Sequence, residues 1–252
     1  MLSSSLLVMF LGAVVVVAVS HLLSRRQEGE PIAMPKGVEM AVGAVSGLFV
    51  FSFAFLAVNA VGELNAARKA SLTEASALKD TYFAAQGLAQ ADRDRVRGEV
   101  VAYTRSVIDA EWPAMRDRRA SEPTVRQLDG LRLHVYQMQA DGEPARAAKA
   151  ETTARLRDVY VARRDRLAQK DAQVPPPILA LMVGAGLVTL TVITLVGRPA
   201  TLLHYGLLAI GAAGVAYMIF LVLQINHPYS GGVSLKPDAY REALVRYEQI
   251  GR

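Results

Sequence analysis

Four stretches of mostly apolar residues stand out along the chain, and they predict helices that cross a membrane. They cover residues 6–23, 40–62, 178–197 and 199–225. A spanning helix needs about 20 apolar residues to cross roughly 30 Å of hydrocarbon. In lipid every backbone amide must be hydrogen-bonded within the protein, and a helix achieves this by itself. The pattern therefore predicts an all-α integral membrane protein with four transmembrane helices, in contact with the lipid bilayer.

The ends of these stretches leave one alternative open. Residues 197–199 are Gly, Arg and Pro, so we expect the last two spans to form an antiparallel hairpin. Residues 18–20 have the small-residue spacing of a signal-peptide cleavage site, which makes a cleaved leader the alternative for the first span. Residues 1–5 lack Lys and Arg, and the apolar run exceeds the roughly 7 to 15 residues of a typical leader, so a retained span is favoured.

A charged segment separates the second span from the third. It divides the chain into transmembrane helices 1 and 2 (1–62), a cytoplasmic helical domain (63–174), a transmembrane hairpin (175–226) and a C-terminal segment (227–252). No helix breaker occurs between Glu63 and Gly87, so the second span should continue as one long helix. Ser121 followed by Pro123 predicts an N-cap, and a C-terminal helix should begin near Pro237. No strand pattern appears.

Composition and charge exclude several functions. The net charge is +5, but basic residues alternate with acids, as in residues 92–95, which is typical of solvated helix faces and not of a nucleic-acid-binding stripe. There is no cysteine, so thiolate catalysis and thiolate metal sites are excluded. The four histidines are scattered, and we expect neither a metal nor a cofactor. Without a phosphate-binding loop or a nucleophile elbow, the protein is not expected to be an enzyme.

The second span carries the pattern that points to a function. Phe51, Phe55 and Asn59 recur at i, i+4 and i+8, with Ser52 beside them and Glu63 one turn further. An apolar ring next to a polar mouth is what a dewetting gate requires, so these five residues are pore-lining candidates. The alternative is that the Phe side chains face lipid, while Asn59 and Glu63 lie at the interface.

Small residues mark candidate helix contacts. Gly43 and Gly47 form a Gly-x-x-x-Gly step in the second span, and Gly211 and Gly214 lie in the fourth. Glycines at this spacing let helices approach closely within lipid. The contact could be with another span of the same chain or with a second subunit.

Several landmarks resemble a known family. They are Asn59 ahead of Arg68, residues 74–78 (Glu-Ala-Ser-Ala-Leu), residues 111–115 (Glu-Trp-Pro-Ala-Met) and residues 228–231 (Pro-Tyr-Ser-Gly). Their order and spacing are similar to those of the bestrophin-like family of bacterial membrane proteins. The resemblance is to a family distantly related to bestrophins, which are pentameric anion (chloride) channels with a pore lined by the second span. It implies a homo-oligomer in the bacterial inner membrane, with Phe51 and Phe55 at the hydrophobic neck.

The chain also departs from the bestrophins. Only about 27 residues follow the last span, and the acidic cluster of the bestrophin calcium clasp is missing, so calcium gating is not expected. Glu63 near the mouth argues against a simple anion preference, because a ring of carboxylates attracts cations.

Two family motifs are interpreted as structural. Glu111, Trp112 and Pro113 could form a binding surface, but a kinked helix whose Trp anchors a core is favoured. Pro228 and Gly231 are expected to form a tight turn that directs the C-terminal helix.

Two functions from different classes follow. The first is an oligomeric ion channel with a pore lined by the second span. The second is a non-conducting scaffold or signalling protein whose cytoplasmic helices bind a protein partner. A ring of subunits centred on the second span would favour the channel.

Orientation follows from the positive charges that flank the spans. Lys and Arg near span ends are held on the cytoplasmic side, and an even number of spans places both termini and the inserted domain together. On that side the flanking charges, such as Arg68, Lys69 and Arg163, outnumber those on the other side, which include Arg25 and Arg198. The inserted domain and both termini are therefore predicted to be cytoplasmic.

Cysteine labelling tests this orientation. The chain has no cysteine of its own, so Ser121→Cys and Arg198→Cys each introduce a single thiol. An impermeant thiol reagent added to intact cells should label position 198 and not position 121. Labelling of position 121 alone would show the inverted topology.

Overall fold

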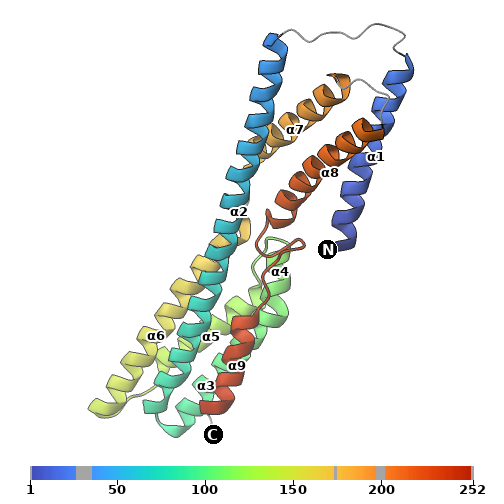
Figure 1. The fold of residues 1–252 in the computed structure, drawn as a ribbon. Coiled ribbons are helices and arrows are strands. Elements are labelled where there is room, and N and C mark those ends of the chain that lie inside the picture. The colour runs from blue at the N-terminus through green and yellow to red at the C-terminus, as the bar shows by residue number, and fades with distance from the viewer. Residues whose placement is uncertain (1, 27–35, 173–174, 197–201, 251–252) are drawn as a thin grey trace. The chain divides into compact units, whose positions relative to one another are not determined.

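The described part of the chain is helical throughout. The computed structural model describes residues 2–26, 36–172, 175–196 and 202–250, and no strand occurs among them (Figure 1). The α-helices are α1 (Leu2–Arg26), α2 (Lys36–Ala84), α3 (Gln90–Ser106), α4 (Trp112–Arg116), α5 (Glu122–Gln137), α6 (Glu143–Ala168), α7 (Pro176–Val196), α8 (Leu202–Ile225) and α9 (Asp238–Ile250). Two 3-10 turns, Ala85–Gly87 and Gln169–Asp171, and one π-helical turn, Val107–Glu111, complete them. The predicted turn at residues 197–199 lies outside the described residues.

The chain divides into two compact units. Unit 1 consists of residues 1–61 and 173–226, and unit 2 of residues 62–172 and 227–252. By length and composition, three ranges of the chain contain an apolar stretch that could cross a membrane, namely Met40–Gly87, Glu143–Thr191 and Leu208–Ile225. The first apolar stretch contributes a shorter apolar helix, Met9–Val19. The fourth span therefore stays a prediction.

Unit 1 is held together by apolar packing among its helices. On α2, Phe49 and Leu56 are buried against Met182 of α7 and Val222 of α8. Helix α1 packs on α8 and, less extensively, on α7. One face of α2 is thus covered within the chain, while the opposite face is left open.

Helix α2 is the longest element and contributes to both units. It runs for 49 residues without interruption, as the absence of a breaker between Glu63 and Gly87 predicts. At a rise of 1.5 Å per residue it is about 70 Å long, more than twice the hydrocarbon thickness of a bilayer. A large part of α2 must therefore lie outside the hydrocarbon.

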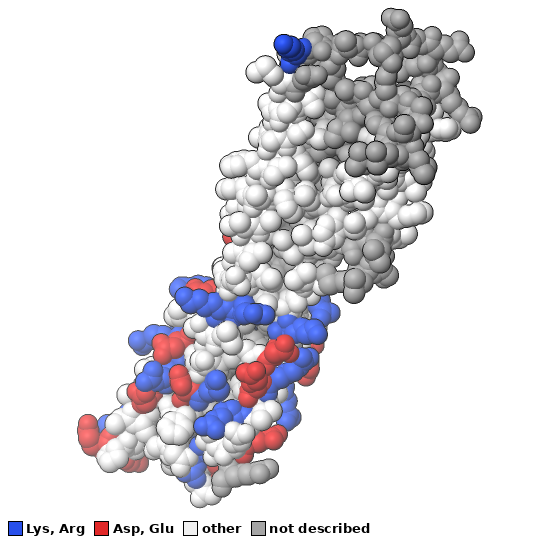
Figure 2. Space-filling model, viewed as in Figure 1, with Lys and Arg blue, Asp and Glu red and all other residues white. Residues whose placement is uncertain are grey.

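Unit 2 is a charged helical body around one core. Figure 2 shows Lys, Arg, Asp and Glu side chains gathered over this unit, whereas the described surface of unit 1 in that view is nearly free of charge. The Ser121 hydroxyl caps α5 by accepting from the backbone N–H of Thr124, which confirms the predicted N-cap. Gly142 has a φ of 88°, a conformation that suits glycine, and α6 begins directly after it.

The C-terminal segment belongs to the core of unit 2. Gly231 has a φ of 92°, and the backbone N–H of Leu235 donates to the carbonyl oxygen of Pro228 at 2.8 Å, which closes a turn. Helix α9 then begins at Asp238, directly after Pro237, and buries Tyr240 and other residues in the core that α2, α3 and α5 share.

Candidate functional site

The predicted pore-lining residues do not all lie on one face of α2. Phe51 and Phe55 are exposed by 69% and 50%, and Asn59 and Glu63 are also exposed. Ser52 is only 6% exposed and lies on the packed face. The single chain therefore presents two large aromatic side chains, and after them a polar and an acidic one, to whatever surrounds it.

Asn59 is partly satisfied by its own helix. Its Nδ2 donates to the carbonyl oxygen of Phe55 at 2.8 Å. This bond lowers the cost of placing the amide in an apolar span and fixes its orientation one turn beyond Phe55. In the described structure the Glu63 carboxylate has no hydrogen bond or ion pair, so it depends on water or on another molecule.

The glycines predicted at helix contacts are open within one chain. A methyl group built on Gly43, Gly47, Gly211 or Gly214 would meet no other atom within 4 Å. Close approach occurs instead at Gly186, where a methyl group would lie 3.0 Å from the Phe49 ring, and at Gly12, where it would lie 2.8 Å from Ala216. The first four glycines are therefore left for lipid or a second subunit, and the sequence reasoning missed the other two.

A network of buried charges lies at the centre of unit 2. Arg166 of α6 donates from Nε to Glu74 of α2 at 2.6 Å and from Nη2 to Glu111 of the π-turn at 2.5 Å. Arg163 donates from Nη2 to the other oxygen of Glu111, also at 2.5 Å. The side chains of Glu74, Glu111 and Arg166 have no exposed surface. The charges of two carboxylates and two guanidiniums thus balance, and their contacts connect α2, the π-turn and α6.

Aromatic side chains enclose this network. The Tyr103 hydroxyl donates to Glu74 Oε1 at 2.7 Å, and the Arg166 guanidinium lies 5.7 Å from the ring centroid of Tyr240. Trp112 donates from Nε1 to the carbonyl oxygen of Leu235 at 3.1 Å and meets the Tyr229 ring edge-on. The surrounding rings exclude water from the charges and join α9 to α2 and α6.

Burial sets the protonation of these groups. Burial raises the pKa of Tyr103 and Tyr240 well above the usual value, and it raises that of Tyr229 to about 12. Burial alone would lower the pKa of the Arg166 guanidinium, but the negative charge of Glu74 and of its other neighbours raises it. The phenols therefore stay neutral, and the Arg166 charge is permanent.

The Glu-Trp-Pro motif supplies part of this centre. Glu111 and Trp112 are buried, whereas Pro113 is exposed in the first turn of α4. The interpretation as a structural anchor missed the ion pairs of Glu111. One sequence feature could have indicated a buried charge. Glu74 is an acid within a helical stripe of small and apolar residues, namely Ala67, Ser71 and Leu78, and all four are buried.

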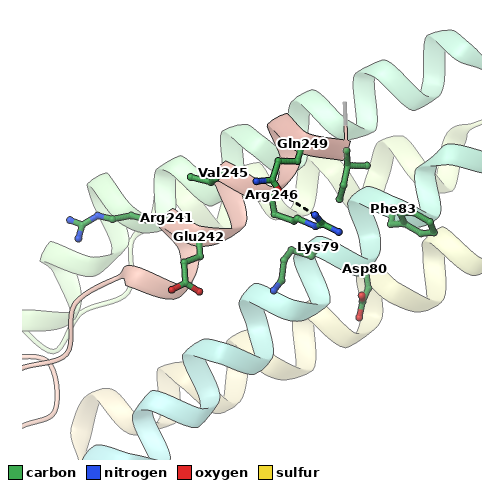
Figure 3. Close-up of a pocket in the computed structure, with 9 residues that line it drawn as sticks. Lys79, Asp80, Phe83, Arg241, Glu242, Val245, Arg246 and Gln249 are labelled. Atoms are coloured by element: carbon green, nitrogen blue, oxygen red, sulfur yellow. Dashed lines mark hydrogen bonds between the residues drawn. The ribbon is translucent and has the colours of Figure 1, made fainter. Parts of the chain in front are cut away.

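A groove lies between α2 and α9 in unit 2. It has a volume of about 690 Å³. It is lined by Lys79, Asp80 and Phe83 of α2 and by Arg241, Glu242, Val245 and Arg246 of α9 (Figure 3). Both signs of charge alternate along it, so it has no clear preference for an anion or a cation. Among the described residues, no group of His, Asp and Glu side chains is arranged to hold a metal ion.

The comparisons with known proteins identify the family. The sequence profile of the Bestrophin-like domain matches residues 7–240, nearly the whole chain. The chain belongs to the Bestrophin-like family. This match confirms the resemblance drawn from the sequence motifs. The matched range of this bestrophin-like chain contains the exposed face of α2 and all four members of the buried charge network.

Its fold is similar to that of a bacterial bestrophin homologue from Klebsiella pneumoniae, known from the crystal structure of a point variant. The two share 12% sequence identity over 98% of each chain, with a TM-score of 0.71. At this identity the comparison shows a common fold. No curated protein matches the sequence.

The buried network predicts a large effect for Arg166. Arg166→Met leaves Glu74 and Glu111 short of a buried counter-charge, which should lower the free energy of unfolding by about 3 to 5 kcal/mol. Unfolding of the purified bestrophin-like protein in detergent can be followed through its single tryptophan, Trp112, which lies beside the network.

Two further variants make the test specific. Arg164→Met changes a residue of the same helix whose side chain is 78% exposed, and it should shift stability by no more than about 0.5 kcal/mol. The double variant Glu74→Met, Arg166→Met should lose less stability than the sum of the single losses, because it removes a matched pair of charges. If the stability loss of the double variant equals the sum of the two single losses, Glu74 and Arg166 do not interact and the network is contradicted.

Proposed function

We propose that the protein assembles into a homo-oligomer that passes ions through a pore lined by α2. The observation that carries this proposal is the exposed face of α2, on which Phe51 and Phe55 precede Asn59 and Glu63. Polar side chains in membrane spans usually face the interior of a bundle or a water-filled cavity. Among the described residues of a single chain, none covers this face, so a lumen shared by several copies is the environment that suits it.

The rest of unit 1 fits an assembly of this kind. The covered face of α2 already packs on α7 and α8 through Phe49 and Leu56, which leaves the other face for the axis. Gly43 and Gly47 are open on the surface of the same helix and suit a close approach by a neighbouring subunit. The family resemblance favours a pentamer in the bacterial inner membrane. The apolar stretches and the flanking positive charges favour four spans with cytoplasmic termini.

The order of side chains along α2 supports a gate. A narrow ring of Phe51 and Phe55 would exclude water by its radius and its lack of hydrogen-bonding partners. Asn59 would form the first polar ring beyond it. Family resemblance favours anions such as chloride, whereas Glu63 would attract cations, so Glu63 is expected to tune the choice of ion.

Removal of the apolar ring tests conduction. Phe51→Ala, Phe55→Ala should widen and wet the neck, so chloride or potassium flux into proteoliposomes should rise above that of the wild type. Because both side chains are exposed, the double variant should lose less stability than the roughly 3 to 5 kcal/mol typical of a buried Phe→Ala change.

Phe49→Ala is the matched control, since Phe49 lies on the packed face of the same helix. It should destabilise the protein without raising flux. If neither the wild type nor the double variant passes ions above empty liposomes while both assemble normally, the pore is excluded and the non-conducting scaffold is the better interpretation.

Glu63→Gln tests the electrostatics of the mouth. Removal of a ring of carboxylates should reduce the permeability to potassium relative to chloride. The reversal potential across a planar bilayer with a KCl gradient measures this ratio. An unchanged reversal potential would show that Glu63 lies away from the ion path.

A further inference from the structure

A cavity between α5 and α6 has the properties of a ligand site. Its volume is about 550 Å³, which lies within the roughly 300 to 1,000 Å³ of known ligand pockets. Val135 and Leu156 form a buried apolar floor. Leu133 and Tyr136 stand at the rim, 55% and 79% exposed. An apolar body could enter from solvent and cover side chains that the chain itself leaves open.

Two unpaired cations line the same cavity. Neither Arg132 nor Arg157 forms an ion pair with any described residue. Their neighbours behave differently, since Arg126 pairs with Glu122, and Arg155 with Glu151, on the same helices. Both unpaired guanidiniums are thus available to a ligand at one place.

The acid in the cavity is already engaged. The Asp129 carboxylate accepts a hydrogen bond from the Tyr160 hydroxyl at 2.8 Å. Burial and this bond raise the pKa of Tyr160, so the phenol stays protonated. The local charge is therefore positive, two guanidiniums against one carboxylate.

One of the cations is held in place before a ligand arrives. The Arg132 guanidinium lies 5.1 Å from the centroid of the Tyr160 ring, within the range of a cation–π contact. Tyr160 is in turn fixed by Asp129. A guanidinium that is already oriented loses less freedom on binding and can meet a carboxylate with two parallel hydrogen bonds.

We propose that this cavity binds a small organic anion, a carboxylate on an aromatic or branched apolar body. The carboxylate would meet Arg132 and Arg157, and the apolar body would lie on Val135 and Leu156. Leu133 and Tyr136 would cover the body from the rim. The site lies wholly within unit 2, and it requires neither a pore nor ion conduction.

Binding of hydrocinnamate to the full-length protein in nanodiscs tests the site. Isothermal titration calorimetry should show saturable binding, and the neutral amide hydrocinnamamide should bind at least about tenfold more weakly, since it lacks the charge-assisted hydrogen bonds. Arg132→Gln and Arg157→Gln should each weaken hydrocinnamate binding at least about tenfold.

The controls separate this site from general attraction of anions. Arg126→Gln removes a cation of α5 that is paired outside the cavity, and it should leave the affinity unchanged. Leu133→Asp places a negative charge at an exposed rim position, so it should abolish binding without unfolding the protein.

Three results of the hydrocinnamate experiment would overturn the proposal, and a fourth comes from an acidic peptide. The three are the absence of saturable binding, equal affinity for acid and amide, and an equal loss in Arg126→Gln. Binding of an acidic peptide without binding of hydrocinnamate would also overturn it, because the surface would then be a protein-docking face. Ion flux does not enter any of these measurements, so the outcome is independent of the proposed channel.

Discussion

The buried guanidinium of Arg166 is the constraint on which the packing of unit 2 depends. A lone charge removed from water costs several kcal/mol, so α6 can bury Arg166 only if carboxylates arrive with it. One comes from Glu74 on α2 and the other from Glu111, 92 and 55 residues distant in the sequence. Three segments must therefore assemble together, since any one of them left out would leave a charge without its partner.

The π-helical turn explains how Glu111 reaches the centre. A π-helical turn is wider than an α-helical one, so it changes the direction in which the side chains after it point. The widened turn Val107–Glu111 shifts the phase, and the side chains of Glu111 and Trp112 are buried together with Val107 and Met115. Glu111 then meets the two arginines while Trp112 reaches the turn before α9. An irregular backbone thus serves the charged and the aromatic parts of the centre at once.

Local features of the fold could be predicted from sequence, whereas the buried network could not. Absence of a breaker predicted the length of α2, and Ser121 and Pro237 marked helix starts, because these signals act within a few residues. The pairing of Glu74 with Arg166 depends on which helix faces meet, and charge spacing carries no trace of that. The burial of Ser52 likewise depends on which face of α2 is packed. Ser52 follows Phe51 directly in the sequence but points about 100° away around the helix, which places it on the packed face near Phe49 and Leu56.

On α2 itself, the two polar groups that follow the Phe side chains differ in their hydrogen-bond partners. The Asn59 amide donates one hydrogen bond to the carbonyl oxygen of Phe55, which reduces the free-energy cost of placing this side chain next to an apolar surface. Glu63, one turn further, has no such partner among the described residues, and a carboxylate in an apolar medium is costly without one. Glu63 therefore needs water or a polar group of another molecule, while Phe55 presents a large apolar surface one turn beyond Asn59. The exposed face of α2 thus changes from aromatic to polar and acidic within these two turns.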